Sequence, residues 1–125
     1  MDSQQPALLT AADLKRTDSG GVMTEKGVGG NGVPAPELVF GRFVIEPNVA
    51  LDPHVHSADT AAYCVRGSCS FRTGEALEHH YEMGPGDYMY IPADTLHTEA
   101  TGADGVELVF ARDRRGGQTT MADRV

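Results

Sequence analysis

Several features that would point to a membrane, a nucleic acid or an export route are missing from this sequence of 125 residues. No apolar run approaches the ~20 residues that a transmembrane helix needs. The first residues have neither the basic region nor the apolar core of a signal peptide. With 18 acidic against 10 basic residues and a net charge of -8, the chain lacks the basic surface that nucleic-acid binding requires. We therefore expect a cytoplasmic protein that binds no nucleic acid and no membrane.

Cysteine is also scarce, and only Cys64 and Cys69 are present. If Arg66-Gly67 forms a two-residue hairpin turn, the two cysteines lie opposite each other and could form a disulfide. In a cytoplasmic protein two reduced, buried thiols are the expected state.

Glycine and proline are abundant, with 15 and 7 residues, and they divide the chain into short apolar segments. The length suits one domain with one core. Roughly seven or eight short strands with turns between them favour a sandwich or a barrel. The predicted strands span residues 37–46, 54–56, 60–65, 68–72, 77–83, 88–91, 97–100 and 106–111. The only predicted helix is short and runs from Ala11 to Lys15, with Thr10 as its N-cap.

The glycine-rich segment 17–36 is predicted to be a flexible loop or arm, with a short edge strand at Val22–Glu25. Its spacing Gly27-x-Gly29-x-x-Gly32 formally matches a dinucleotide fingerprint. We reject that interpretation because no strong strand precedes it and the prolines that follow exclude the required helix. The predicted organisation is an N-terminal arm over 1–36, a barrel over 37–112 and a C-terminal tail over 113–125.

Three histidines form the candidate site. His54 and His56 are one residue apart on a predicted strand, so their side chains point to the same face. His97 follows the turn at Pro92 and can close on them. Three imidazoles that converge inside a small barrel would hold a borderline divalent metal. The alternative is that they only form hydrogen bonds inside the barrel.

Two motifs around these histidines resemble the cupin superfamily. In the first, His54-x-His56 is followed after three residues by Thr60 and after six more by Gly67. In the second, Gly86 is followed after five residues by Pro92-Ala93-Asp94 and after two more by His97. The resemblance covers about residues 37–112. It implies an all-β, single-domain cupin jelly-roll β-barrel, here with a short N-terminal helix or arm.

The sequence departs from the family pattern where the first motif has a glutamate, because Thr60 stands there. In metal-binding cupins that glutamate is usually the fourth protein ligand. The resemblance therefore implies a metal at His54, His56 and His97, whose fourth position is filled by Asp59, by His79 or His80, or by water. The metal could be Zn, Fe, Ni, Cu or Mn, and a nitrogen in place of the carboxylate favours the first four over Mn.

Three residues are candidates for acid–base catalysis. Asp59 is a candidate general base, or it caps the turn after His56. His79 is a candidate proton carrier, since alternation along 77–83 should send either it or His80 inward. Glu99 is two residues after His97 and shares its face.

Other side chains receive simpler interpretations. Tyr63, Tyr88 and Tyr90 are core or rim aromatics, and Arg112 to Arg115 form the solvated end of the last strand. The apolar wall of the barrel is predicted to contain Phe40, Phe71, Met83, Met89 and Phe110.

The sequence thus predicts a metal-dependent enzyme that acts on a small organic molecule. The resemblance allows isomerase, cyclase or lyase chemistry, with the metal as a Lewis acid, and it also allows a dioxygenase. The alternative is a non-enzymatic module that binds a sugar or another metabolite. We expect a homodimer, because exposed edge strands need cover.

Overall fold

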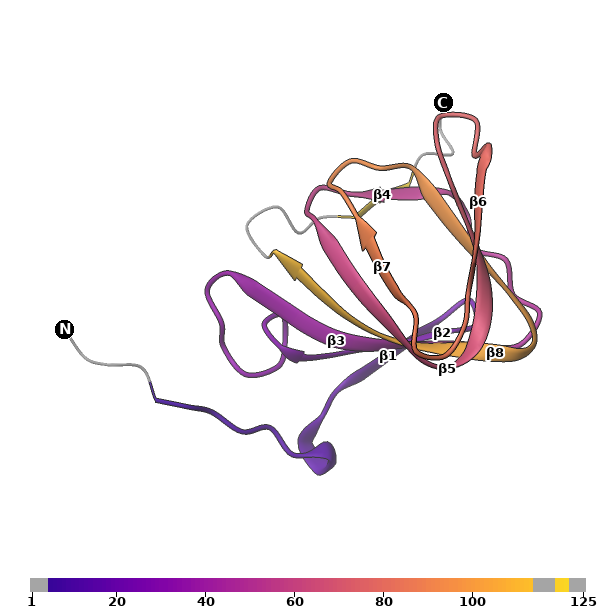
Figure 1. Ribbon diagram of the computed structural model, residues 1–125. Coiled ribbons are helices and arrows are strands. Elements are labelled where there is room, and N and C mark those ends of the chain that lie inside the picture. Colours follow the sequence, from indigo (N-terminus) through magenta and orange to yellow (C-terminus); the bar gives the residue numbers. More distant parts are fainter. Residues whose placement is uncertain (1–4, 114–118, 122–125) are drawn as a thin grey trace.

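The computed structural model describes residues 5–113 and 119–121, and it confirms the predicted all-β jelly-roll fold (Figure 1). Within this part of the chain, the only helical segment is the single 3-10 turn η1 (Ala11–Asp13). The strands are β1 (Arg16–Ser19), β2 (Val22–Val28), β3 (Leu38–Ile45), β4 (His54–His56), β5 (Thr60–Thr73), β6 (His79–Met83), β7 (Tyr88–Ile91), β8 (His97–Asp113) and β9 (Thr119–Met121). None of the described segments is a helix long and apolar enough to cross a membrane.

The barrel is built on two long, bent strands, β5 and β8, which pair with each other along almost their whole length. The C-terminal half of β8 also pairs with β3, and His97 at its start pairs with His54 of β4. The other edge of β5 carries β7 and β6. Because β5 and β8 form part of both halves of the barrel, residues of the first and second histidine motifs face the same interior.

The predicted hairpin at Arg66-Gly67 is wrong, because β5 continues through it with two register irregularities. Gly67 pairs with Val106 at the corner where both strands bend. Its φ is +74°, and a Cβ there would lie 2.1 Å from the carbonyl oxygen of Gly105. A glycine that only looked like a hairpin turn therefore allows a bend within one strand. The predicted turn at 102–105 is likewise part of β8.

The short strand predicted at Val22–Glu25 is confirmed as part of β2, although it pairs on both sides and is not an edge strand. The rest of the predicted loop over 17–36 is wrong where β1 forms and where β2 continues to Val28. β2 pairs with β3 from Val22 opposite Ile45 to Val28 opposite Phe40, so the sheet extends into the predicted arm. Glu25 of β2 is buried between Arg16 and Arg42, and these ion pairs join β1, β2 and β3.

The two ends of the chain differ from expectation in smaller ways. The helix is shorter than predicted, and the Thr10 side chain makes no capping bond to it. Within the predicted tail, Thr119–Met121 forms β9 beside β4. Residues 114–118 and 122–125 of that tail lie outside the described residues.

The core fills the barrel with the inward residues of β3, β5, β6 and β8. The predicted wall is confirmed for Phe71, Met83 and Phe110, which are buried, and Met89 packs against them. Phe40 is 45% exposed, because on β3 the neighbouring Val39 and Gly41 face inward instead. Cys64 and Cys69 are buried free thiols, as expected.

Candidate metal centre and its pocket

The three histidines meet inside the barrel, as the sequence predicts. His54 and His56 point inward from β4, and His97 pairs with His54 at the start of β8. One nitrogen from each ring lies within 4.8 Å of one from each of the others. The ring centroids of His54 and His97 are 4.2 Å apart, and those of His54 and His56 are 5.2 Å apart. Among the described residues this is the one such group of histidine, cysteine and carboxylate side chains.

Backbone carbonyls fix the orientation of two rings. Nδ1 of His54 donates to the carbonyl oxygen of Asp52 at 2.8 Å, and Nδ1 of His97 donates to that of Thr95 at 3.0 Å. Since a carbonyl only accepts, the proton of each neutral ring is on Nδ1 and its Nε2 keeps a free lone pair.

Two of the three histidines, His56 and His97, are also held in the neutral form. Burial, together with the charge of Arg112, lowers the pKa of His56 to about 3. Burial lowers the pKa of His97 to about 4. Neutral imidazoles with oriented lone pairs are the donors that a borderline divalent metal requires, so these residues fit a metal ion.

Arg112 lies next to the position at which the family pattern has a glutamate. Thr60, which replaces the motif glutamate, is 3% exposed and pairs in register with Arg112. Arg112 Nε donates to Thr60 Oγ1 at 3.0 Å, and its Nη2 is 3.5 Å from His56 Nε2. Burial lowers the pKa of Arg112 and Glu99 partly offsets this, yet a guanidinium keeps its charge in a protein.

The prediction that Arg112 is a solvated strand end is wrong, since it is only 7% exposed. Its position on β8 contained the signal. Val106, Leu108 and Phe110 face inward at alternate positions, and Arg112 continues that series.

Glu99 shares the inward face with His97, as predicted, and is 8% exposed. Its Oε1 lies 3.7 Å from His54 Nε2 and accepts no hydrogen bond from the described residues. Burial raises the pKa of this carboxyl group. A buried carboxylate with an unsatisfied oxygen beside a histidine is suited to hold or move a proton.

The structure does not bring Asp59 into the cluster. Its side chain is exposed, and Oδ1 accepts a hydrogen bond from the backbone N–H of Ala93 at 2.9 Å. This contact ties the loop after β4 to the turn after β7, which matches the alternative interpretation of Asp59 as a turn residue.

His79 and His80 also lie away from the cluster. Both are exposed, and their Nε2 atoms face Glu78 and Glu82. The prediction that alternation sends one of them into the barrel is wrong, because β6 lies at the edge of the sheet with β5 as its only described partner.

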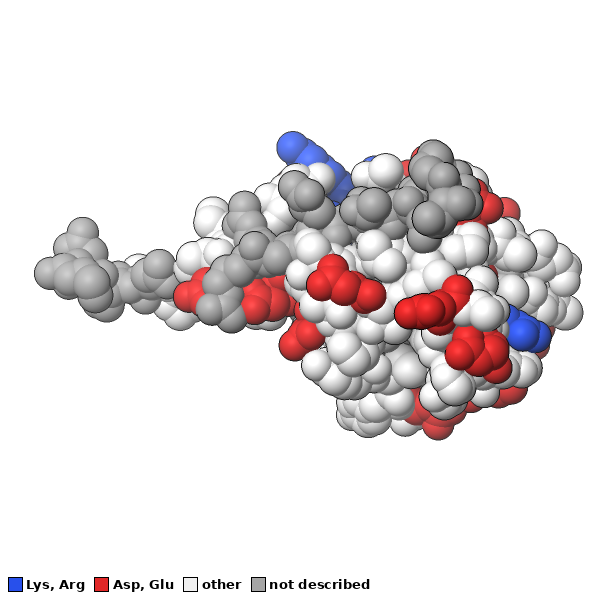
Figure 2. Space-filling model, turned by 90° about the horizontal axis from the view of Figure 1, so that it is seen from above, with Lys and Arg blue, Asp and Glu red and all other residues white. Residues whose placement is uncertain are grey.

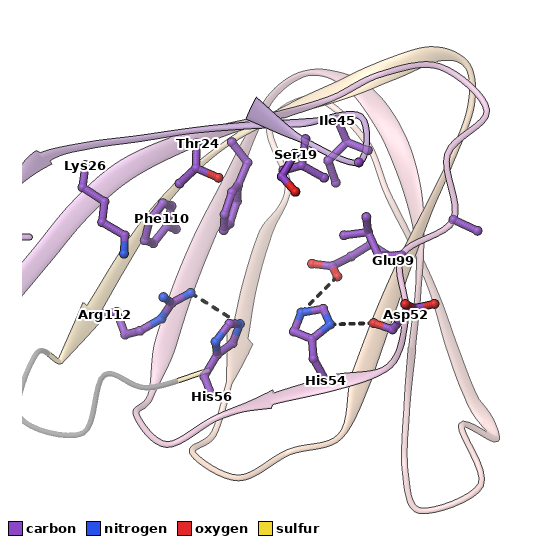
Figure 3. Close-up of a pocket in the computed structure, with 15 residues that line it drawn as sticks. Ser19, Thr24, Lys26, Ile45, Asp52, His54, His56, Glu99, Phe110 and Arg112 are labelled. Atoms are coloured by element: carbon purple, nitrogen blue, oxygen red, sulfur yellow. Dashed lines mark hydrogen bonds and ion pairs between the residues drawn. The ribbon is translucent and has the colours of Figure 1, made fainter. Parts of the chain in front are cut away.

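A pocket of about 550 Å³ opens in front of His54 and His56. Glu99 and Arg112 line it together with Lys26 of β2, whose side chain points toward Arg112 (Figure 3). The rings of Phe43 and Phe110, stacked with centroids 4.5 Å apart, form an apolar wall. His97 lies along a smaller recess of about 20 Å³, which His56, Glu99 and Arg112 also line.

Sequence reasoning missed Lys26 because it ended the predicted edge strand at Glu25, whereas β2 continues to Val28. The alternation of Val22, Thr24 and Lys26, all of which line the pocket, would have placed it once the strand was recognised.

Comparison with known families and proteins agrees with this geometry. The sequence matches the cupin domain over residues 41–111, a stretch that contains all three histidines. No curated protein matches the chain closely enough to be reported.

Solved structures share the fold at low sequence identity. The polyketide cyclase RemF from Streptomyces resistomycificus is 19% identical, with a TM-score of 0.77, and the match covers 94% of this chain and 86% of that one. Oxalate decarboxylase from Bacillus subtilis, described with Mn(II) centres, is 18% identical, with a TM-score of 0.78 and coverage of 97% and 34%. The DMSP lyase DddQ from Ruegeria pomeroyi is 14% identical, with a TM-score of 0.78 and coverage of 89% and 62%. The chain thus spans about a third of the decarboxylase, 34%.

Proposed function

Because this chain belongs to the cupin family, we propose that it is a metal-dependent enzyme that acts on a small organic molecule. The observation that carries the proposal is the convergence of His54, His56 and His97 within 4.8 Å beside a pocket of about 550 Å³. That volume suits a small ligand.

A divalent transition metal (Zn, Fe, Ni, Cu or Mn) on the three histidines would supply Lewis-acid chemistry, or oxygen chemistry if it is iron or another redox metal. The proposed reaction is therefore an isomerisation, a cyclisation or a lyase reaction, or alternatively a dioxygenation. Glu99 holds or moves a proton at its carboxyl group, close to His54. Phe43 and Phe110 keep water from one side of the ligand.

The first test is the metal content of the purified protein, measured by mass spectrometry on the native chain and on His54→Ala, His97→Ala and His80→Ala. His80→Ala is the matched control, because that histidine is exposed on β6. We expect a stoichiometric metal in the native chain and in the control, and its loss in the other two variants. A native chain that carries no metal, and that no added divalent metal stabilises against heat, would overturn the proposal.

The second candidate is a non-enzymatic cupin that binds a small metabolite. The contact between Arg112 and His56 favours it, because a fixed positive charge beside a ligand nitrogen opposes metal binding. The same metal measurement separates the two candidates.

We also propose that the protein is a cytoplasmic homodimer. The segment that starts at Gln5 extends away from the barrel (Figure 1), and Leu8 in it is 87% exposed. A second copy could cover such a segment and the open edge of β1. The two buried free thiols support a reducing compartment.

A further inference from the structure

The pocket has a cationic end, formed by Arg112 and Lys26. Both side chains line the pocket and lie on its His56 side, whereas Glu99 and Asp52 lie on the His54 side (Figure 3). Among the described residues neither Arg112 nor Lys26 forms an ion pair. Arg112 is 7% exposed and bonds only uncharged side chains, Thr60 and His56.

A buried guanidinium without a carboxylate in an ion pair is costly, and most such groups are paired, whereas Glu99 offsets the burial of Arg112 only in part. The chain has a net charge of -8, so acidic partners are not scarce. Figure 2 shows a face on which acidic side chains outnumber lysine and arginine. The cationic end therefore stands out from the rest of the protein and is suited to an anion that enters the pocket.

The wall beside this end is aromatic and apolar. The Phe43 and Phe110 rings stack at an interplanar angle of 16°, and the Arg112 Cζ atom lies 4.9 Å from the Phe110 ring centroid. A guanidinium held over a ring keeps its plane and its outward N–H groups in a fixed position. The Phe110 ring is itself 1% exposed, since Phe43 and Arg112 cover it, so a flat apolar body would lie against Phe43, with a carboxylate at its end close to those donors.

We propose that the ligand of this pocket is a small carboxylic acid with a flat, unsaturated body. Its carboxylate binds Arg112 and Lys26, its flat body lies against Phe43, and its remaining end faces His54 and Glu99. This inference rests on the proposed function for the location of the reacting end, but carboxylate binding itself requires no metal.

The test is calorimetric titration of the metal-free full chain, kept in chelator, with cinnamate and with its neutral counterpart cinnamamide. The variants are Arg112→Gln, Arg112→Lys and Lys26→Gln. Arg72→Gln serves as the control, because Arg72 is exposed on β5. Circular dichroism and thermal melting verify that each variant is folded.

We expect the native chain to bind cinnamate at least about tenfold more tightly than cinnamamide, the scale of a charge-assisted hydrogen bond. Arg112→Gln should remove this preference, Lys26→Gln should reduce it several-fold, Arg112→Lys should retain part of it, and Arg72→Gln should leave it unchanged.

Three results would overturn the inference: equal affinity for acid and amide, no binding of cinnamate up to about 10 mM, or a preference that Arg112→Gln leaves intact. Loss of cinnamate binding in His54→Ala but not in Arg112→Gln would also overturn it, since the carboxylate would then sit at the histidines. If the chain binds cinnamate through Arg112 but never binds a metal, the proposed metal-dependent function is refuted and the inference about carboxylate binding stands.

Discussion

At the scale of single residues, the exchange of a glutamate for Thr60 determines the charge of the site. Thr60 accepts a hydrogen bond from Arg112 Nε at 3.0 Å and is 3% exposed. With no carboxylate at this position, the guanidinium keeps its positive charge available to the pocket. One substitution should therefore shift the site from anion binding toward metal binding.

We predict that Thr60→Glu raises the affinity for a divalent metal and weakens cinnamate binding, each by about tenfold or more. The new carboxylate would pair with Arg112 and add an anionic ligand beside His56. Titration with Zn²⁺ or Mn²⁺, and separately with cinnamate, measures both effects. Thr60→Gln, of similar size but neutral, should not raise metal affinity. Equal behaviour of the two variants would mean that the charge at this position does not control the site.

The histidine cluster could be predicted from sequence because only the period of a strand and one turn were needed. His54 and His56 share a face in any strand, and the turn at Pro92 returns the chain to them. Arg112 was missed for a different reason. An arginine beside other charged residues resembles a solvated end, although the inward alternation of Val106, Leu108 and Phe110 continues to it and its register with Thr60 shows that it is buried. His79 was misplaced because short-range alternation does not tell where the sheet ends, and Asp59, proposed because it stands next to the replaced glutamate, lies in a turn.

At the scale of elements, the bend shared by β5 and β8 depends on Gly67. Its φ is +74° and an added Cβ would lie 2.1 Å from a backbone oxygen of Gly105. We predict that Gly67→Ala lowers the free energy of unfolding by about 3 kcal/mol, since strain and a backbone clash add. Gly86→Ala is the control, because Gly86 has a φ of +90° but no atom within 4 Å of an added Cβ.

Gly86→Ala should lower the free energy of unfolding by only about 1 kcal/mol, the penalty for the left-handed conformation alone. Urea denaturation of both variants measures the difference. Equal costs would show that the clash at the corner of β5 and β8 relaxes without consequence.

The strands β1, β2 and β3 are joined by the ion pairs of Glu25. Arg42 Nη2 lies 2.7 Å and Arg16 Nε lies 2.6 Å from Glu25 Oε1. The hydrogen bond from Arg42, with a further one from Arg16, holds the pKa of the Glu25 carboxyl below its usual range. Because the folded-state pKa is depressed, this stabilisation is full above the ordinary carboxyl pKa of about 4.3 and is lost as pH falls below it.

We predict that Glu25→Gln destabilises the protein by about 2 kcal/mol at neutral pH. A fully buried broken pair would cost more, but both arginines are partly exposed. The cost should shrink in acid, so urea denaturation at pH values on both sides of about 4 measures it. Glu75→Gln is the control, since that carboxylate is exposed and forms no ion pair among the described residues. A pH-independent cost at position 25 would contradict the role assigned to the charge.

The strands in which apolar residues alternate clearly were predicted well. The errors lie where a glycine can indicate either a hairpin turn or a bend within one strand. Gly67 and Gly105 look like hairpin turns, yet they let one strand bend without ending. In segment 17–36, frequent glycines concealed β1 and the end of β2 after Glu25, and the stability of β2 comes from pairing with β3 and from Glu25 rather than from local propensity. Long-range pairing of this kind cannot be read from neighbouring residues.

At the scale of the whole molecule, charge is distributed unevenly between surface and interior. The net charge of -8 keeps copies of the chain apart, while the pocket presents Arg112 and Lys26. A stable association of two copies must therefore offset this repulsion, for which apolar contacts are suited. The segment before β1 offers such contacts, because Leu8 is 87% exposed there.

We predict that removing residues 1–13 converts a dimer into a monomer without unfolding the barrel. The deletion ends before β1, so every strand and the pocket remain. Sedimentation velocity measures the mass, and thermal melting with cinnamate titration verifies that the barrel and its pocket are intact. Removing only residues 1–4 is the control, since Leu8 and Leu9 stay in place and the dimer should persist. A native chain that sediments as a monomer would refute the homodimer, and a dimer that survives the longer deletion would move the contact from the N-terminal segment to the strand edges.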